Sequence, residues 1–171
     1  MTRPLYENDR HKGAESSLVR IVLEPTWRCR AVKLPISYGL DHLLMRGRQA
    51  VAFLEVKGKP QHTFDEMVAM IGGVPLDLDK LERALNYQML TKLPFALVCA
   101  FSDGIYRTVI VDIARGAPYV VRYGGRTDRG DWQDREPYVV LEPLTFKYLC
   151  PNRWSAKALE GNVVQLRGGS E

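Results

Sequence analysis

The stretch that decides the fold is Gly39-Leu-Asp-His-Leu-Leu-Met-Arg-Gly-Arg-Gln-Ala-Val-Ala-Phe-Leu-Glu-Val-Lys57. Two apolar runs flank a short polar turn, which is the pattern of a β-hairpin. Side chains alternate along the second run, so Glu55 and Lys57 share one face of the strand. If the strands pair about the turn, Asp41 lies beside Leu54 or Glu55, depending on the register. Ionisable groups at the end of an apolar strand are costly unless they are paired, metal-bound or at an edge. The hairpin therefore predicts a cluster of two carboxylates and one lysine, a candidate divalent-metal site.

Composition limits the class of protein. The chain has 171 residues, of which 46% are apolar and 26% are charged, so we expect one soluble domain with a real core and not a disordered chain. The net charge of +4 is a mild bias toward anionic partners. Three widely spaced cysteines (Cys29, Cys99, Cys150) argue against a disulfide framework or zinc ribbon. No apolar run has the length of a membrane span. We expect a cytoplasmic protein with no membrane partner.

Periodicity and turn residues predict the other elements. We expect helices over residues 13–23, 64–71 and from Asp77 or Asp79 to about residue 92, and strands over residues 30–36, 95–101, 105–111, 119–123 and 138–141. The first helix should bury a stripe formed by Ala14, Leu18, Ile21 and Val22, and the long helix one formed by Leu78, Leu81, Leu85 and Met89. Glu24 before Pro25 should end the first helix, because a residue before proline avoids the α region. Thr63 and Glu66 form a capping box for the middle helix.

This order predicts an α/β core with a mixed sheet flanked by helices. We assign residues 1–112 to the core and residues 113–171 to a β-rich carboxyl-terminal extension packed on the same domain. The extension contains a glycine- and arginine-rich loop over residues 124–137.

The combination of motifs resembles the PD-(D/E)xK nuclease superfamily, which has the restriction-endonuclease-like fold, and within it most closely the small archaeal-type Holliday-junction resolvases. The resemblance rests on Lys12-Gly13-Ala14 at the helix start with Glu15 in the first turn, and on Asp41 opposite the tripeptide Glu55-Val56-Lys57. It covers about residues 12–112. Two departures are present. The family's proline before the aspartate is Leu40 here, and an additional capped helix precedes the long one, so that Lys80, Tyr87 and Gln88 are alternative candidates for a family residue on the long helix.

The resemblance implies a role for each matched residue. Asp41 and Glu55 would bind Mg²⁺ or Mn²⁺, with the backbone carbonyl of Val56 as a further ligand. Glu15 would bind the ion directly or through water, and Glu7 is the alternative for that role. Hard oxygen ligands suit such ions. Lys57 would orient or deprotonate the attacking water and stabilise charge on the phosphate.

A plainer interpretation needs no chemistry. An acidic-x-Lys tripeptide arises by chance about once in a chain of this length and charge content. Glu55 and Lys57 would then form an ordinary salt bridge, and Asp41 would cap a turn after Gly39. The coincidence of four placed residues with the expected element order favours the nuclease interpretation.

The leading prediction is therefore a Mg²⁺-dependent DNA endonuclease acting on branched or recombination intermediates, with RNA as an alternative substrate. Arg46 and Arg48 at the hairpin turn, together with Lys59, are the candidate nucleic-acid contacts. Symmetric cutting of a branched substrate would require a homodimer. The rival prediction is a non-catalytic protein that keeps the nuclease fold and binds or inhibits a partner through the carboxyl-terminal extension.

Overall fold

The computed structural model describes residues 15–109, 120–125 and 135–152. Residues 15–18 are α-helical. The later helical segments are η1 (Val19–Leu23), α2 (Glu24–Trp27), η2 (Ile36–Tyr38), α3 (Phe64–Ile71), α4 (Leu78–Thr91) and η5 (Pro143–Thr145). The strands are β1 (Arg30–Lys33), β2 (His42–Arg46), β3 (Gln49–Lys59), β4 (Val74–Asp77), β5 (Phe95–Phe101), β6 (Ile105–Val109), β7 (Val121–Gly125), β8 (Arg135–Leu141) and β9 (Lys147–Cys150).

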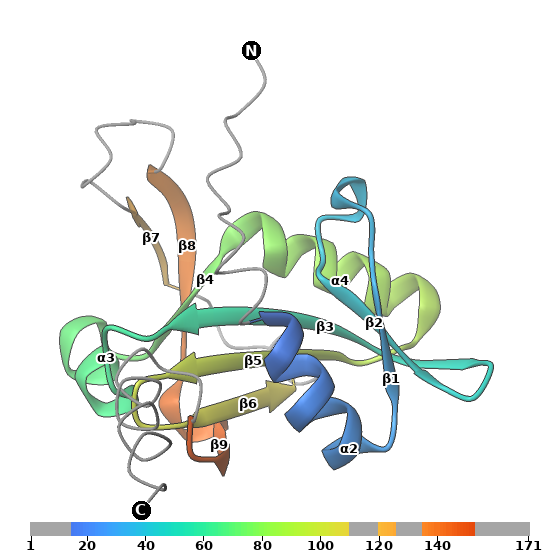
Figure 1. Ribbon diagram of the computed structural model, residues 1–171. Helices are drawn as coiled ribbons and strands as arrows, with labels where there is room; N and C mark the ends of the chain where they lie inside the picture. Colours follow the sequence, from blue (N-terminus) through green and yellow to red (C-terminus); the bar gives the residue numbers. More distant parts are fainter. Residues whose placement is uncertain (1–14, 110–119, 126–134, 153–171) are drawn as a thin grey trace, which may run out of the picture.

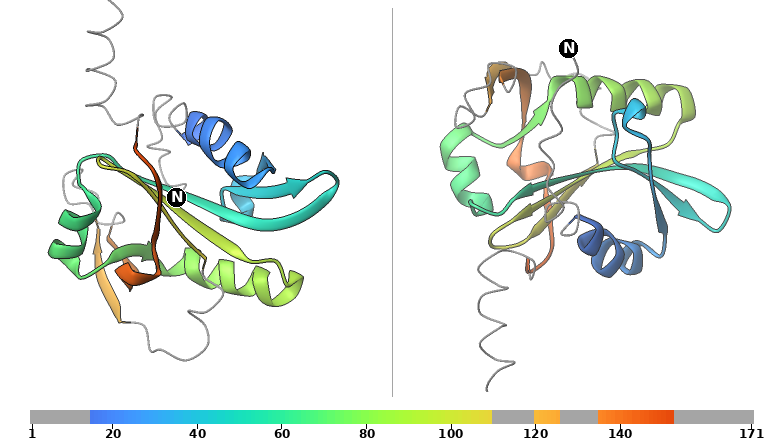
Figure 2. Two further views of the ribbon diagram at one scale, coloured as in Figure 1. Left: turned by 90° about the horizontal axis from the view of Figure 1, so that it is seen from below. Right: turned by 45° about the horizontal axis from the view of Figure 1, so that its top comes forward.

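Two sheets are present in the described residues. The larger has the strand order β1-β2-β3-β5-β6-β9, and the smaller has the order β4-β8-β7. Only the β3–β5 pair in these sheets is parallel, and its crossover contains α3, β4 and α4. The amino-terminal helical segment covers one face of the larger sheet, while α4 lies against the other (Figures 1 and 2). This is the mixed α/β arrangement, with helices flanking a sheet, that the sequence predicts.

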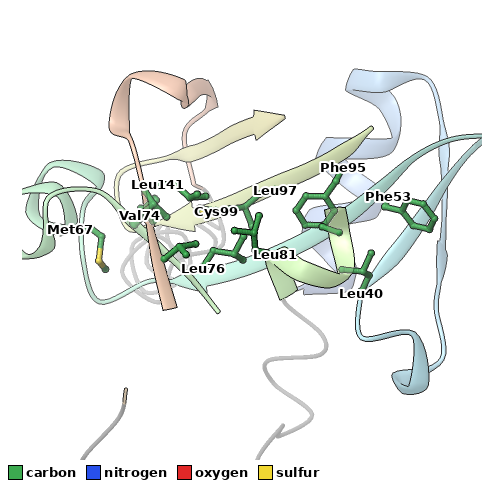
Figure 3. Packing of buried hydrophobic residues seen from close by; sticks show 13 residues of the cluster. Leu40, Phe53, Met67, Val74, Leu76, Leu81, Phe95, Leu97, Cys99 and Leu141 are labelled. Atoms are coloured by element: carbon green, nitrogen blue, oxygen red, sulfur yellow. The ribbon is translucent and has the colours of Figure 1, made fainter. Parts of the chain in front are cut away.

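Alternation along β3 directs its side chains into two separate cores. Phe53 packs with residues of α4 and β5, and Figure 3 shows this core with Leu81, Phe95 and Leu97. Leu54 packs on the other face with residues of the amino-terminal helical segment. Because side chains two apart on a strand share a face, Glu55 and Lys57 lie on the same side as Phe53, toward α4.

The first helix differs from the prediction at its end. It continues beyond Pro25 to Trp27, through the π-helical turn η1, and Glu24 keeps helical backbone angles (φ −59°, ψ −48°). Pro25 lies in the first turn of α2, where a missing N–H is tolerated. The wider turn also shifts the buried stripe to Leu18, Val19 and Leu23, leaving the predicted core residue Ile21 60% exposed.

The two later helices match their predicted positions. The capping box of α3 is present, with Thr63 and Glu66 each accepting from the other's backbone N–H. In α4, Leu81 is buried as predicted, but Met89 is 63% exposed. Tyr87 takes the inward position at that end of the helix by stacking on Phe53, with the ring centroids 5.2 Å apart.

Proline explains two differences among the strands. β1 ends at Lys33, before Pro35, and the last residue of the predicted strand, Ile36, begins the 3-10 helix η2. β4, which the sequence did not predict, contains Pro75 and lies at the edge of its sheet, where a missing N–H is tolerated.

The carboxyl-terminal strands extend further than predicted. β8 begins at Arg135 and β7 reaches Gly125, so both ends of the predicted 124–137 loop are strands. β9, also unpredicted, pairs with β6 of the larger sheet. Residues 110–111 of the predicted hairpin arm and residues 126–134 of the loop lie outside the described residues. None of the helices in the described ranges is long and apolar enough to cross a membrane.

Candidate active site

Asp41 is fixed by the backbone at the start of the hairpin. β2 and β3 pair with His42 opposite Leu54, which places Asp41 opposite Glu55, one of the two predicted registers. The Val56 N–H donates to Asp41 Oδ2 at 2.9 Å, and the Leu34 N–H donates to the Asp41 carbonyl at 2.9 Å. Asp41 therefore binds across the hairpin and does not simply cap the turn after Gly39. Burial raises the pKa of Asp41, but the Val56 N–H and the Lys80 charge lower it more, so the carboxylate is ionised.

Glu55 is the buried carboxylate of the site. Its side chain is only 2% exposed, and it faces two ammonium groups. Lys80 Nζ lies 2.9 Å from Oε1 and 3.1 Å from Oε2, whereas Lys57 Nζ lies 3.6 Å from Oε1. Burial and the charge of Asp41 raise the pKa of Glu55 to about 7 although both lysines oppose this shift. Burial is the larger of the two causes, and carboxylates with pKa values perturbed in this way cluster at functional sites, although structural ion-pair networks produce them too.

The closest charged partner of Lys57 is Asp77, and Glu55 is more distant. Its Nζ lies 2.6 Å from Asp77 Oδ2. Burial lowers the pKa of Lys57, but the carboxylates of Asp77 and Glu55 raise it by more, so Lys57 remains an ammonium. Asp77 occupies the N-cap position of α4, as one of the two predicted alternatives, yet makes no capping hydrogen bond. The nearby Lys57 holds this carboxylate instead.

Glu15 belongs to a neighbouring cluster. Its Oε1 lies 2.6 Å from Lys33 Nζ and 3.7 Å from His42 Nε2, and Lys33 in turn lies 3.4 Å from Asp41 Oδ1. Lys33 thus bridges Glu15 and Asp41. Burial and the Lys33 charge lower the pKa of His42 to about 4, so this imidazole is neutral.

The donor atoms suit a magnesium or manganese ion at Asp41 and Glu55. Asp41 and Glu55 lie opposite each other across the hairpin, and the charge of Asp41 raises the pKa of Glu55, so their carboxylates are close enough to interact. The N–H and C=O of one strand residue point to the same strand edge. Because Asp41 accepts from the Val56 N–H, the Val56 carbonyl also faces the edge where Asp41 lies. Two carboxylates and a carbonyl match the few protein ligands that Mg²⁺ takes beside its waters. Within the described ranges no group of three His, Cys, Asp or Glu side chains is placed to hold a metal, so Glu15 does not complete such a set here. Glu7, its predicted alternative, lies outside those ranges.

Comparison with known proteins bears on this geometry. A protein-family model described as "Phage putative PDDEXK endonuclease" matches residues 1–149. The chain belongs to this family. No curated protein and no solved structure matches the chain. Membership in the PDDEXK family implies the restriction-endonuclease-like fold and confirms the predicted superfamily, whereas the likeness to archaeal Holliday-junction resolvases finds no support in the match.

Two charged residues of the PDDEXK candidate site were not assigned from the sequence. Asp77 was predicted only as a helix cap, and Lys80 was one of three alternatives on the long helix. Tyr87, the second alternative, packs on Phe53, and Gln88, the third, has a buried Oε1 without a hydrogen-bond partner in the described residues. The sequence does contain a signal for Lys80. A cation in the first turn of a helix is unfavourable because it opposes the helix dipole, so a lysine there suggests a nearby anionic partner.

The predicted nucleic-acid contacts lie at two ends of β3. Arg46 and Arg48 flank Gly47 at the hairpin turn, where Arg46 Nη2 lies 3.4 Å from the Trp27 carbonyl and Arg48 is exposed. Lys59, at the other end, is near enough to Asp77 to lower the pKa of that carboxyl. Since a strand rises by about 3.3 Å per residue, Arg48 is roughly 20 Å along the strand from Glu55. Of these three residues, Lys59 is the one that lies near a carboxylate of the site, that of Asp77.

The pKa of Glu55 predicts an unusual dependence of stability on pH. A folded-state pKa of about 7, against an ordinary 4.5, means that the folded protein binds this proton more tightly than the unfolded chain. The contribution of Glu55 to stability should therefore be lost as the pH rises through this interval. We expect the Glu55→Gln variant to gain about 2–3 kcal/mol in unfolding free energy over wild type between pH 5 and pH 8. Urea unfolding in EDTA measures this difference.

The exposed Glu82 provides the control for this measurement. Glu82→Gln should keep the wild-type pH profile. If the Glu55→Gln and wild-type profiles run parallel, the carboxyl of Glu55 does not have a raised pKa.

Proposed function

We propose that the protein is a metal-dependent endonuclease that hydrolyses DNA phosphodiester bonds, with Asp41, Glu55 and Lys57 as its catalytic set. The observation that carries the proposal is the buried carboxylate of Glu55 beside Asp41, with two lysine ammoniums against it. Family membership supports nuclease chemistry. A buried carboxylate beside a second, partly buried one is costly to a fold, and a divalent cation between them would offset that cost.

Each side chain has a role in this proposal. Asp41, Glu55 and the Val56 carbonyl hold Mg²⁺ or Mn²⁺, which when bound supplies water activation and charge neutralisation at the phosphate. Lys57 keeps its proton, because Asp77 and Glu55 hold it as an ammonium. We therefore assign Lys57 to orienting the phosphate and stabilising its developing charge, and not to abstracting a proton. Glu15 orders Lys33 beside Asp41.

The test begins with cleavage. Purified protein is incubated with single-stranded, duplex and four-way-junction DNA, and with a matched RNA, in Mg²⁺ or Mn²⁺. Cleavage of any DNA supports the proposal, and cleavage of none overturns it. Preference for the junction would support branched intermediates as the substrate, and a homodimer by sedimentation would then be expected because two symmetric cuts require two sites.

A metal titration tests the ligands separately. We expect Asp41→Asn to weaken Mn²⁺ binding by about tenfold or more, since the ligand charge count sets the affinity of such sites. Isothermal titration calorimetry measures the change. Glu82→Gln, which removes an exposed carboxylate from α4, should bind Mn²⁺ as wild type does. Equal Mn²⁺ affinity in wild type and Asp41→Asn would remove Asp41 from the ligand set.

The rival function is supported by one observation. Both oxygens of Glu55 already lie against Lys80, as in a site that needs no metal. A non-catalytic protein that engages a partner through residues 113–171 would bind no Mn²⁺ and would cleave nothing. It would lose partner binding when that extension is removed.

A further inference from the structure

Lys80 occupies the position on Glu55 that a cation would take. Its ammonium is nearly equidistant from the two carboxylate oxygens, at 2.9 and 3.1 Å. The other lysine near Glu55 does not compete for this position, because Lys57 lies 2.6 Å from Asp77 but 3.6 Å from Glu55. Lys80 is therefore the main counter-charge of Glu55.

The position of Lys80 on α4 is unfavourable for an ordinary helix residue. It lies in the first turn, where the helix dipole disfavours a cation. The side chain is 21% exposed, whereas that of Glu55 is 2% exposed. The Lys80 side chain thus reaches from solvent to a buried carboxylate, on a flexible stem that allows it to leave.

We propose that Lys80 is a counter-cation that the divalent ion displaces from Glu55, and that the released ammonium then binds a phosphate of the nucleic-acid substrate. This inference rests on the proposed function, since it takes Glu55 as a ligand of the ion. A divalent ion bound to Glu55 would repel an ammonium held within 3.1 Å of the same oxygens. Two carboxylates near Lys80 are already engaged, because Asp41 would itself bind the ion and Asp77 is paired with Lys57 at 2.6 Å. The substrate phosphate would then be the anion open to the released ammonium.

The displacement couples the two ligands. Metal binding frees Lys80 for the phosphate, and the phosphate removes Lys80 from Glu55, so each ligand strengthens the binding of the other by the same factor. A lysine that only holds the Glu55 side chain in place would give the opposite result, because its removal would loosen the metal ligand.

The first measurement is Mn²⁺ binding by isothermal titration calorimetry at pH 8.0 without nucleic acid. We expect Lys80→Met to bind Mn²⁺ about tenfold more tightly than wild type, because the competing charge is gone. Lys80→Arg, which keeps the charge, should stay closer to wild type. The matched control is Lys92→Asn, which removes a charge at the other end of α4 and suits the left-handed backbone there (φ 61°).

The second measurement is the affinity of wild type and of Lys80→Met for a fluorescent DNA duplex, by anisotropy. Both proteins keep Glu55, and both are measured with and without Mn²⁺ at a temperature too low for turnover. Mn²⁺ should increase the duplex affinity of wild type more than that of Lys80→Met. The two increases should differ by a factor of about ten, the scale of one charge-assisted phosphate contact. Unchanged or weaker Mn²⁺ binding by Lys80→Met, or an undiminished effect of Mn²⁺ on duplex binding, overturns the inference. Failure of wild type to bind Mn²⁺ overturns the proposed function as well, whereas wild type that binds Mn²⁺ and cleaves DNA leaves the proposed function standing whatever Lys80 does.

Discussion

Glu55→Gln is expected to reduce DNA cleavage by about a thousandfold or more at saturating Mg²⁺, the scale of losing one group that stabilises charge in the transition state. The side chain keeps its shape but can no longer hold a divalent cation beside Asp41. It also leaves the two ammoniums near it without their shared counter-charge. Initial rates on the preferred substrate measure the loss.

Stability separates this loss from misfolding. Because the carboxyl of Glu55 has a pKa of about 7, the glutamine variant should be at least as stable as wild type at pH 8. An inactive but more stable protein is the expected pair of results. Glu82→Gln should cleave at the wild-type rate. Undiminished cleavage by Glu55→Gln would show that the active site lies elsewhere in the chain.

The local part of the site could be predicted from the sequence. The turn and the two alternating runs narrow the partner of Asp41 to Leu54 or Glu55. A register shift between Leu44 and Met45, which the sequence pattern did not predict, selects Glu55. The same alternation put Glu55 and Lys57 on one face. The α3 capping box and the buried β5 strand were equally local, and their predicted bounds agree with the structure.

The distant part could not be predicted. Asp77 and Lys80 reach the site because α4 packs on the face of the larger sheet that carries Glu55 and Lys57. No local sequence pattern predicts that long-range contact. Asp77 had a sufficient local explanation as a helix cap, which concealed its ion pair. β9 is short and pairs with β6 across a large sequence separation, so its four residues carry little signal of their own.

Membership in the nuclease family does not by itself say how the lysine of the motif, Lys57, acts. Substitution of Lys57 tests its role. Lys57→Met should lower cleavage by about 10²–10⁴-fold at saturating Mn²⁺, the range for a positioned group that stabilises charge or transfers a proton. Mn²⁺ binding should not weaken, since Lys57 is not a ligand and the removal of a positive charge beside Glu55 favours a cation. Calorimetry and cleavage rates on the same preparations separate the two effects.

Asp77→Asn distinguishes the two roles of the lysine. The variant keeps the ammonium but removes the charge of its closest partner, which lies 2.6 Å away in the wild type. The pKa of Lys57 would therefore fall, although Glu55 still opposes the effect of burial. If Lys57 orients phosphate as an ammonium, cleavage by Asp77→Asn should fall by about tenfold and fall further as the pH rises. If Lys57 abstracts a proton, the easier deprotonation would raise cleavage near pH 8 instead, which would contradict the role assigned here. Lys92→Asn, which removes a distant charge on α4, should leave both the rate and its pH profile unchanged. The direction of the Asp77→Asn effect therefore reports which protonation state of Lys57 meets the substrate.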